Sequence, residues 1–380
     1  MAPPGLRHYP CLDGLRGIAI LLVIPHNADI VVPVLHGPFA ILTLLNGRGW
    51  IGVELFFVLS GFLITEQLYL SRGASNYFRG FYARRILRIV PLFVAAILLA
   101  LALTKMFHGT DLHGIQTPGW VLWLGLFVIN WTEPMGHSIP GFPQFWSLAV
   151  EEQFYLVWPA VVHGFTPRLI ALSIGIALVA LAARIVLRFL GAPPDTVYMW
   201  TVCRMDALAF GAIAALIVQR WRVQNAIPRA WPWVAGASAA ALIGALLTRL
   251  YTLNTWPTQT VGFTFLGLAC MLILLGGVAN DLAPQQIRAL AFLRSRLLAS
   301  VGRYSYGMYV FHMFFVIFAG SWLTRFVTPF GNARMLAWAL LVIALSYAAG
   351  FLSYHLYEKH FLRLGRIFAP VQPQTSSIAA

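Results

Sequence analysis

The sequence contains few charged residues and many apolar ones. Only 10% of its 380 residues are Asp, Glu, Lys or Arg, whereas 59% are hydrophobic. Soluble domains carry about 25% charged residues. This shortage excludes an ordinary cytosolic enzyme, a disordered tail and a nucleic-acid binder with a solvated basic face, so no nucleic-acid partner is expected. The composition predicts an integral membrane protein.

Cysteine is also scarce, and the three present are Cys11, Cys203 and Cys270. They are far apart and odd in number, which fits neither a disulfide framework nor the spacing of a metal site. We therefore expect no metal and no bound cofactor. A cleavage site of small residues is lacking after the first apolar run, and this absence favours an uncleaved first transmembrane helix over a signal peptide.

Ten apolar runs are long enough to cross a bilayer, which takes about 20 helical residues. They lie at about 13–34, 51–70, 88–106, 147–163, 169–190, 198–219, 231–250, 258–278, 303–323 and 335–356. These runs predict an all-α integral membrane protein, a single polytopic bundle of about ten transmembrane helices. We expect one transmembrane domain over 1–369 and a disordered C-terminal tail over 370–380, where proline, serine and alanine accumulate.

The basic residues predict the orientation of the chain, because short cytoplasmic loops retain Lys and Arg. If the shorter apolar segment 118–131 does not cross, eighteen of the 26 basic residues fall on one side and five on the other. We therefore expect a re-entrant or interfacial helix at 118–131. The protein is expected in the inner or plasma membrane, surrounded by lipid, with both termini in the cytoplasm.

Four polar residues inside apolar runs are candidates for function, because each costs a few kcal/mol unless it faces the bundle interior or a water-filled cavity. They are His26, Glu54, Glu151 and His312. A hydrogen-bonded core residue is the alternative for both histidines, and a solvated interface acid is the alternative for Glu54. Glu151 shares a helix face with Tyr155 and Ser147, four residues away on either side.

Arginines form two further candidate groups. Arg84 and Arg88, with Arg85 between them, repeat at a spacing of four on one helix face, where guanidinium groups can bind phosphates. Anchoring to lipid headgroups is the alternative for each. Arg204 and Asp206 begin another helix, and a structural ion pair with neighbouring helices is as well supported as a functional role.

Six sequence blocks together resemble the acyltransferase type 3 family. They are Leu12-Asp13-Gly14-Leu15-Arg16-Gly17, Phe56 to Phe62, Tyr82 to Pro91, Trp146 to Tyr155, Arg204 to Leu208, and Gly302 to Tyr309. Members of this family are membrane-embedded O-acyltransferases that move an acyl group, commonly acetyl, from cytoplasmic acyl-CoA to a hydroxyl of a sugar or other acceptor. Some carry a further esterase-like domain after the membrane part, which we do not expect in this sequence.

The family motif is Arg or Lys, ten residues, then His, which points to Arg16 and His26. Here only nine residues intervene, and Asn27 occupies the regular position. Eleven helical steps return a side chain to within about 20° of its start, whereas ten leave it about 80° away. A local bulge at Pro25, where a proline removes a helical hydrogen bond, would rotate His26 inward.

Acyl transfer to an alcohol needs a base, and a neutral imidazole suits this task. His26 is the predicted base, with Glu151 first and Glu54 second as the carboxylate that orients it. Arg204 or a backbone donor would stabilise the oxyanion. We expect these residues and Asp206 to share a cavity in the outer half of the membrane. The predicted substrate-binding residues are Arg16, Arg84, Arg85, Arg88, Arg204, Asp206, Tyr155 and His312.

Other functions compete with this hypothesis. A transporter of a lipid-linked sugar or acyl donor also needs buried charges, but the sequence lacks an evident inverted repeat. A catalytically inactive relative is favoured by the shortened spacing after Arg16. If the chain is an enzyme, direct attack on acyl-CoA and a relay through an acylated residue are both open. The acceptor, a carbohydrate or glycolipid, would enter between the outer loops 35–50, 107–146 and 251–257.

Overall fold

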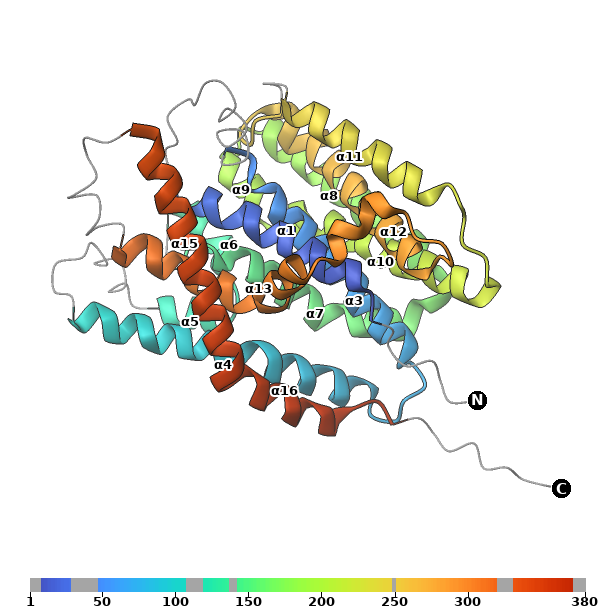
Figure 1. Cartoon of the computed structure of the whole chain (residues 1–380), viewed down its shortest axis with the longest axis horizontal. Coiled ribbons are helices and arrows are strands. Elements are labelled where there is room, and N and C mark those ends of the chain that lie inside the picture. The colour runs from blue at the N-terminus through green and yellow to red at the C-terminus, as the bar shows by residue number, and fades with distance from the viewer. Residues whose placement is uncertain are drawn as a thin grey trace.

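The protein is described here by a computed structural model of the whole chain (Figure 1). It describes residues 8–28, 47–106, 119–136, 142–247, 251–319 and 331–371. Every regular element in these ranges is helical, so the all-α class is confirmed. The predictions made for most of the 370–380 tail, for most of the outer loop 35–50, and for the parts 107–118 and 137–141 of the outer loop 107–146 lie outside the described residues.

Long helices occur at all ten predicted positions. They are α1 (Pro10–Asn27), α3 (Ile51–Leu70), α4 (Tyr77–Met106), α7 (Phe145–Phe165), α8 (Leu169–Phe189), α10 (Thr201–Gln224), α11 (Trp231–Leu247), α12 (Phe263–Leu282), α13 (Arg296–Phe314) and α15 (Gly331–Ser353). Six helical stretches of the described chain are long and apolar enough to cross a membrane. The count of about ten crossings therefore stays a prediction. Helix α4 begins eleven residues before the predicted span, so Arg84, Arg85 and Arg88 are helical.

Shorter elements connect these helices. They are α5 (Trp120–Gly125), α6 (Ile129–Thr132), α9 (Pro194–Met199), α16 (Lys359–Gly365), the 3-10 segments η3 (Glu133–Met135), η4 (Thr166–Arg168), η6 (Arg288–Arg294) and η9 (Arg366–Phe368), and the π segments η5 (Thr258–Gly262), η7 (Phe315–Ala319) and η8 (Tyr354–Glu358). The left-handed backbone of Phe127, with φ of 53°, separates α5 from α6. Each of these two helices is too short to span about 30 Å of hydrocarbon, as expected for segment 118–131.

The centre of the bundle is built on close contacts between helix backbones. On α3, a Cβ atom at Gly61 would collide with the carbonyl oxygen of Leu208 on α10, and a Cβ atom at Gly302 on α13 would collide with the carbonyl oxygen of Asp13 on α1. Glycine permits such approaches, and small residues drive helix packing in membranes because they let dispersion contacts form between backbones. These contacts fix α1, α3, α10 and α13 around the interior.

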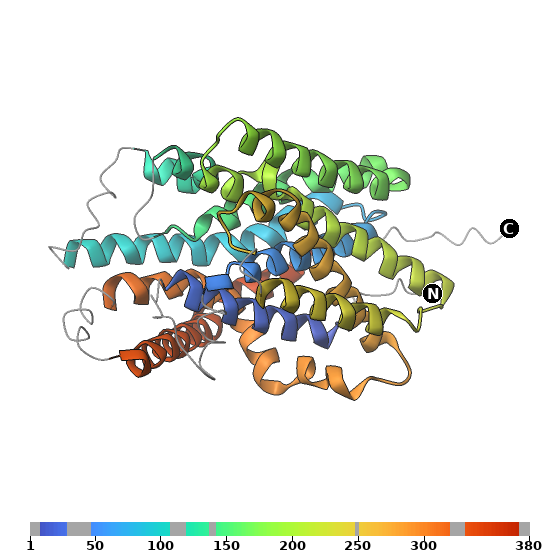
Figure 2. The same ribbon diagram turned by 90° about the horizontal axis from the view of Figure 1, so that it is seen from above.

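The outer helices surround this centre and turn apolar side chains away from it. Leu98 on α4, Leu178 on α8 and Leu352 on α15 are exposed. Helix α4 lies along one edge of the bundle in Figure 1, and the green α8 lies along one edge in Figure 2. In contrast, α3 is buried along almost its whole length. This arrangement of an apolar exterior around buried polar residues is the one expected for a bundle surrounded by lipid.

Both ends of the described chain lie at the same end of the bundle. The hydroxyl of Tyr9, just before α1, donates to Glu66 near the end of α3 at 2.8 Å. After α3, the backbone N–H of Ser75 donates to the carbonyl of Val371 at 3.1 Å. The side of the membrane on which the two termini lie stays a prediction.

Candidate functional site

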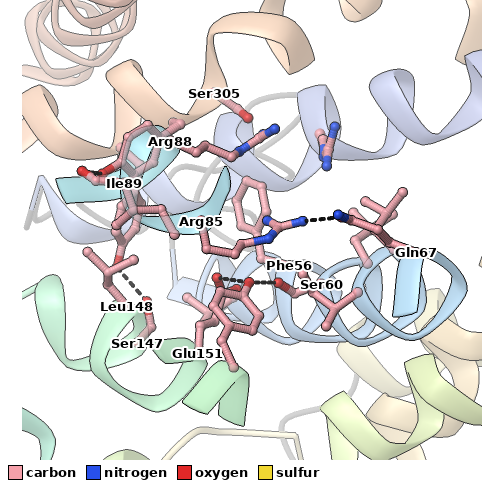
Figure 3. Close-up of a pocket in the computed structure, with 18 of the residues that line it drawn as sticks. Phe56, Ser60, Gln67, Arg85, Arg88, Ile89, Ser147, Leu148, Glu151 and Ser305 are labelled. Atoms are coloured by element: carbon pink, nitrogen blue, oxygen red, sulfur yellow. Dashed lines mark hydrogen bonds between the residues drawn. The ribbon is translucent and has the colours of Figure 1, made fainter. Parts of the chain in front are cut away.

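A cavity of about 450 Å³ lies between α1, α3, α4, α7 and α13. Its lining combines apolar and polar side chains, and α3 contributes both kinds (Figure 3). The exposed side chain of His8 lies at its border. A volume of this size is typical of a site for a small molecule or for part of a larger one.

Three arginines line the cavity, Arg16 from α1 and Arg85 and Arg88 from α4. The spacing of three between Arg85 and Arg88 places both on one helix face. Arg85 Nη2 donates to Gln67 Oε1 at 3.1 Å, and its guanidinium lies 5.4 Å from the centre of the Tyr155 ring. Several N–H groups of a guanidinium remain for a ligand after one such contact.

The carboxylate of Glu151 faces the same cavity from α7. The hydroxyl of Tyr155 donates to Glu151 Oε2 at 2.8 Å, and the hydroxyl of Ser60 on α3 donates in turn to Tyr155 (Figure 3). This confirms that Glu151 and Tyr155 share a helix face that points inward. Glu151 is thus held in one orientation within a cavity that also contains three cationic side chains.

Two tyrosines of α13, Tyr306 and Tyr309, also line the cavity. The hydroxyl of Tyr309 donates to the carbonyl of Gln144, and Ser147 Oγ lies 2.7 Å from the Tyr309 hydroxyl. One turn earlier, the hydroxyl of Tyr306 donates to the carbonyl of Ile89 at 2.8 Å. These contacts join α13 to α7 and α4 at the cavity wall.

A second group of buried charges lies apart from this cavity. Arg204 on α10 donates to Glu54 on α3, and Arg184 on α8 donates to Asp206 Oδ2 at 2.7 Å. All four side chains are 0% exposed. The Arg204 guanidinium also lies 4.2 Å from the centre of the Phe263 ring. We refer to these four residues as the enclosed cluster.

The enclosed cluster corrects the prediction of one shared cavity. The side chains that line the cavity described above include Glu151 but neither Glu54, Arg204, Asp206 nor His26. Glu54 and Arg204 begin α3 and α10, which pack so closely that these residues face each other and not the cavity. The alternative of a structural ion pair, left open for Arg204 and Asp206, describes their contacts in the structure.

Arg84 also differs from its prediction. Its Nη1 donates to the carbonyl of Phe368 in η9, and the Asn76 side chain donates to the carbonyl of Ala369 at 2.8 Å. Arg84 therefore attaches the segment after α16 to the beginning of α4. The prediction aligned Arg84 with Arg88 at a spacing of four. The two arginines of α4 that line the cavity are Arg85 and Arg88, at a spacing of three.

The end of α1 does not contain the predicted bulge. Helix α1 continues through Pro25 to Asn27, so the amide of Asn27 reaches α13, where its Nδ2 lies 3.1 Å from Nε2 of His312. His26 lies beside the segment that precedes α3, since a Cβ atom at Gly49 would come within 2.7 Å of its Cβ.

The family model for the acyltransferase domain matches residues 9–355. The chain belongs to the acyltransferase type 3 family. Three relatives are the O-acetyltransferase OatA of Staphylococcus aureus, 29% identical over 346 residues, the peptidoglycan O-acetyltransferase OatA of Listeria monocytogenes, 28% identical over 324 residues, and the putative peptidoglycan O-acetyltransferase YrhL of Bacillus subtilis, 28% identical over 373 residues.

This acyltransferase type 3 chain spans about half the length of these relatives. The matches cover 85%, 80% and 93% of this chain but 53%, 49% and 55% of the three relatives, in the same order. No solved structure matches the chain. The arrangement of the cavity therefore comes from the present structure alone.

Sequence reasoning on this acyltransferase type 3 chain missed several residues of the two sites. Arg184 lies inside an apolar run and received no role, although its position in that run was a signal that a partner such as Asp206 must exist. Ser60 lies within the block Phe56 to Phe62 but received no role of its own. Tyr306 and Tyr309 are uncharged, so the search for charged residues in apolar runs did not select them as candidates. Among the described residues, no group of three or more His, Cys, Asp or Glu residues could hold a metal ion.

Proposed function

We propose that the chain is a membrane O-acyltransferase that transfers an acyl group, acetyl in the simplest case, from cytoplasmic acyl-CoA to a hydroxyl of a sugar or glycoconjugate. Family membership and the names of the three relatives support this reaction class. The observation that carries the proposal is the cavity in which Arg16, Arg85 and Arg88 meet Glu151.

The arginines suit the donor. Guanidinium groups present planar arrays of N–H donors that match phosphate oxygens, and CoA carries its phosphates at one end and its thioester at the other. We propose that the phosphates bind near Arg85 and Arg88 at the end of the bundle where the chain begins. The pantetheine arm would then lie along the apolar wall of α3 and bring the thioester toward Glu151.

The reaction has simple requirements. The acceptor hydroxyl oxygen forms an ester bond with the acyl carbon while the carbon–sulfur bond breaks, and the hydroxyl proton passes through a base to the departing thiolate. Glu151 is oriented by Tyr155 and Ser60, and we propose that it binds that hydroxyl or stabilises a positively charged base. Catalytic roles for His26 and Glu54 stay predictions.

The acceptor is proposed from chemistry and from the relatives. Two of the three relatives are named as acting on peptidoglycan, so a sugar hydroxyl of a cell-envelope glycan is the acceptor class to test first. With both termini in the cytoplasm of an inner or plasma membrane, this acceptor would approach from the outer end of the bundle, opposite to the donor. The surrounding lipid would contact α4, α8 and α15.

Purified protein in lipid nanodiscs tests the proposal. Incubation with acetyl-CoA and soluble glycan fragments should release free CoA and add one acetyl group to the fragment, measured by a thiol assay and by mass spectrometry. Glu151→Gln, which keeps the shape of the side chain, serves as the matched control. Absence of both products with every acceptor offered, from a folded protein, would contradict the proposal.

A further inference from the structure

The regular course of α1 decides which side chain lies above the cavity. Because α1 stays helical to Asn27, the eleven steps from Arg16 to Asn27 bring both residues to nearly the same helix face, within about 20°. His26 lies about 80° away on the same helix. The face of α1 that lines the cavity with Arg16 therefore leads to an amide and not to an imidazole.

The imidazole on this face belongs to α13. His312 is fully buried, and its Nδ1 lies 2.7 Å from the carbonyl oxygen of Tyr309. A carbonyl accepts hydrogen bonds, so Nδ1 carries the proton and Nε2 holds a lone pair. That lone pair accepts from the amide Nδ2 of Asn27 at 3.1 Å. Both ring nitrogens are thus accounted for, and the basic one faces α1.

His312 lies one helical turn beyond the cavity wall. Tyr309, three residues earlier on α13, lines the cavity, and the centres of its ring and of the His312 ring are 5.5 Å apart. At 1.5 Å per residue, Asn27 lies about 16 Å along α1 from Arg16. An acyl donor with its phosphates near the arginines and an acceptor arriving from the opposite end would meet on the side of the cavity toward His312.

We propose that His312 is the general base of the transfer and that Asn27 positions it, a proposal that rests on the acyltransferase function proposed above. Nε2 of His312 takes the proton from the acceptor hydroxyl as the hydroxyl oxygen bonds to the acyl carbon. The carbon–sulfur bond breaks, and the imidazolium returns the proton to the CoA thiolate. Asn27 holds Nε2 until the acceptor hydroxyl replaces its amide as the hydrogen-bond donor.

The side chain of Asn27 is well suited to this exchange. A neutral amide donates a hydrogen bond to the lone pair without adding a charge to a buried site, where an unpaired charge is unfavourable. The Tyr309 carbonyl keeps the other nitrogen protonated throughout, as the partner of a catalytic imidazole does in hydrolytic triads. Removal of Asn27 would leave the base in place but less well oriented.

Histidine variants of the purified protein test the assignment. We expect His312→Ala to lower the rate of acetyl transfer at least 100-fold, the usual lower limit for the loss of a general base, and added imidazole to restore part of it. His163→Ala on α7, which removes another ring that packs against aromatic side chains, should leave the rate near that of the wild type. A histidine that only fills the core would not give imidazole rescue.

His26→Ala tests the competing assignment, in which His26 is the general base. Loss of activity in His26→Ala together with a normal rate in His312→Ala would overturn the proposal and return the role to α1. If His312→Ala does not fold, His312→Gln, which keeps a hydrogen-bonding side chain, takes its place, and an unchanged rate in this variant would also overturn it. A wild-type protein inactive on all acceptors would instead contradict the acyltransferase function itself.

Asn27→Ala distinguishes positioning from proton transfer. We expect a drop in kcat of about two- to tenfold with little change in the KM for acetyl-CoA, since one hydrogen bond contributes about 0.5–1.5 kcal/mol. Imidazole should not rescue this variant, because His312 is still present. A rate equal to that of the wild type would remove Asn27 from the proposal, and a loss as complete as in His312→Ala would contradict the division of roles.

Discussion

The enclosed cluster and the cavity both contain buried charged side chains, but the two sites differ in how these charges are paired and in how much open volume lies beside them. In the enclosed cluster each arginine is paired with one carboxylate, Arg204 with Glu54 and Arg184 with Asp206, and all four are fully buried. In the cavity, Arg85 and Arg88 face open volume together with two lining carboxylates, Glu151 and Glu66, of which Glu66 is paired with Arg222.

This difference separates structural charges from charges that can bind a ligand. A buried ion pair is costly to break, because the remaining partner is left without compensation in a medium of low dielectric. A charge at the border of a cavity can be solvated there and can exchange water for a substrate. A charged side chain within a membrane bundle therefore indicates a ligand-binding function only when it lies beside a cavity that can hold the ligand.

Removal of one charge from the enclosed cluster should have the largest effect. We expect Arg184→Ala to destabilise the folded protein by about 3–5 kcal/mol, because Asp206 would keep a buried charge without its partner. Thermal unfolding in detergent, followed by circular dichroism, would measure the loss. Arg88→Ala is the matched control from the cavity and should change the unfolding temperature much less. Equal destabilisation by both variants would contradict the comparison.

The Glu151 carboxylate of the cavity should affect chemistry instead of stability. We expect Glu151→Gln to lower the transfer rate by roughly ten- to hundredfold, because a hydrogen bond from the acceptor hydroxyl to a charged carboxylate contributes about 1.5–3 kcal/mol, with an unfolding temperature close to that of the wild type. The acetyl transfer assay and thermal unfolding, made on the same preparation, check both parts. A folded variant with a normal rate would exclude Glu151 from the reaction.

The cavity arginines should act on donor binding. A hydrogen bond to a charged group contributes about 1.5–3 kcal/mol, so Arg85→Ala should raise the Kd for acetyl-CoA by roughly ten- to hundredfold. Isothermal titration calorimetry in nanodiscs would measure it, and added salt should weaken wild-type binding as well. Arg84→Ala, which breaks the contact with the Phe368 carbonyl, is the neighbouring control. Stronger loss of binding in Arg84→Ala would reverse the assignment.

The smallest expected effect comes from the hydroxyl that orients Glu151. Tyr155→Phe removes one hydrogen bond to the carboxylate and its contact with Ser60. A neutral hydrogen bond contributes about 0.5–1.5 kcal/mol, which corresponds to a two- to tenfold lower rate. Initial-rate kinetics would detect this change. A loss as large as that of Glu151→Gln would mean that Tyr155 itself takes part in the reaction.

Much of the fold could be predicted, because a membrane imposes helices on every apolar run of sufficient length. The positions of the long helices followed from that constraint. The distribution of arginine predicted that 118–131 does not cross, and the two short helices there fit this expectation, which stays a prediction. The apolar run at 88–106 marks only part of α4, which begins at Tyr77, because Arg84, Arg85 and Arg88 lower the hydropathy of its first turns. Hydropathy marks the hydrocarbon part of a helix and not its ends.

The candidate site was predicted less completely, because helix faces follow from local sequence but helix neighbours do not. The inward face shared by Glu151 and Tyr155 required only the helical period. The ion pair between Glu54 and Arg204 depends on how α3 packs against α10. The glycines that allow this packing lie far apart in the sequence, and no local pattern shows which of them meet. The contact between Asn27 and His312 similarly joins residues 285 positions apart.

The most direct test of the account is photoaffinity labelling with a photoreactive acyl-CoA, followed by mass spectrometry of the labelled peptides. The account predicts labels on the segments of α3, α4 and α7 that line the cavity, near Ser60, Arg85 and Glu151, and their loss in Arg85→Ala and under competition by acetyl-CoA. Labels confined to peptides of the enclosed cluster, or labelling that Arg85→Ala does not change, would contradict the claim that the arginine cavity binds the donor.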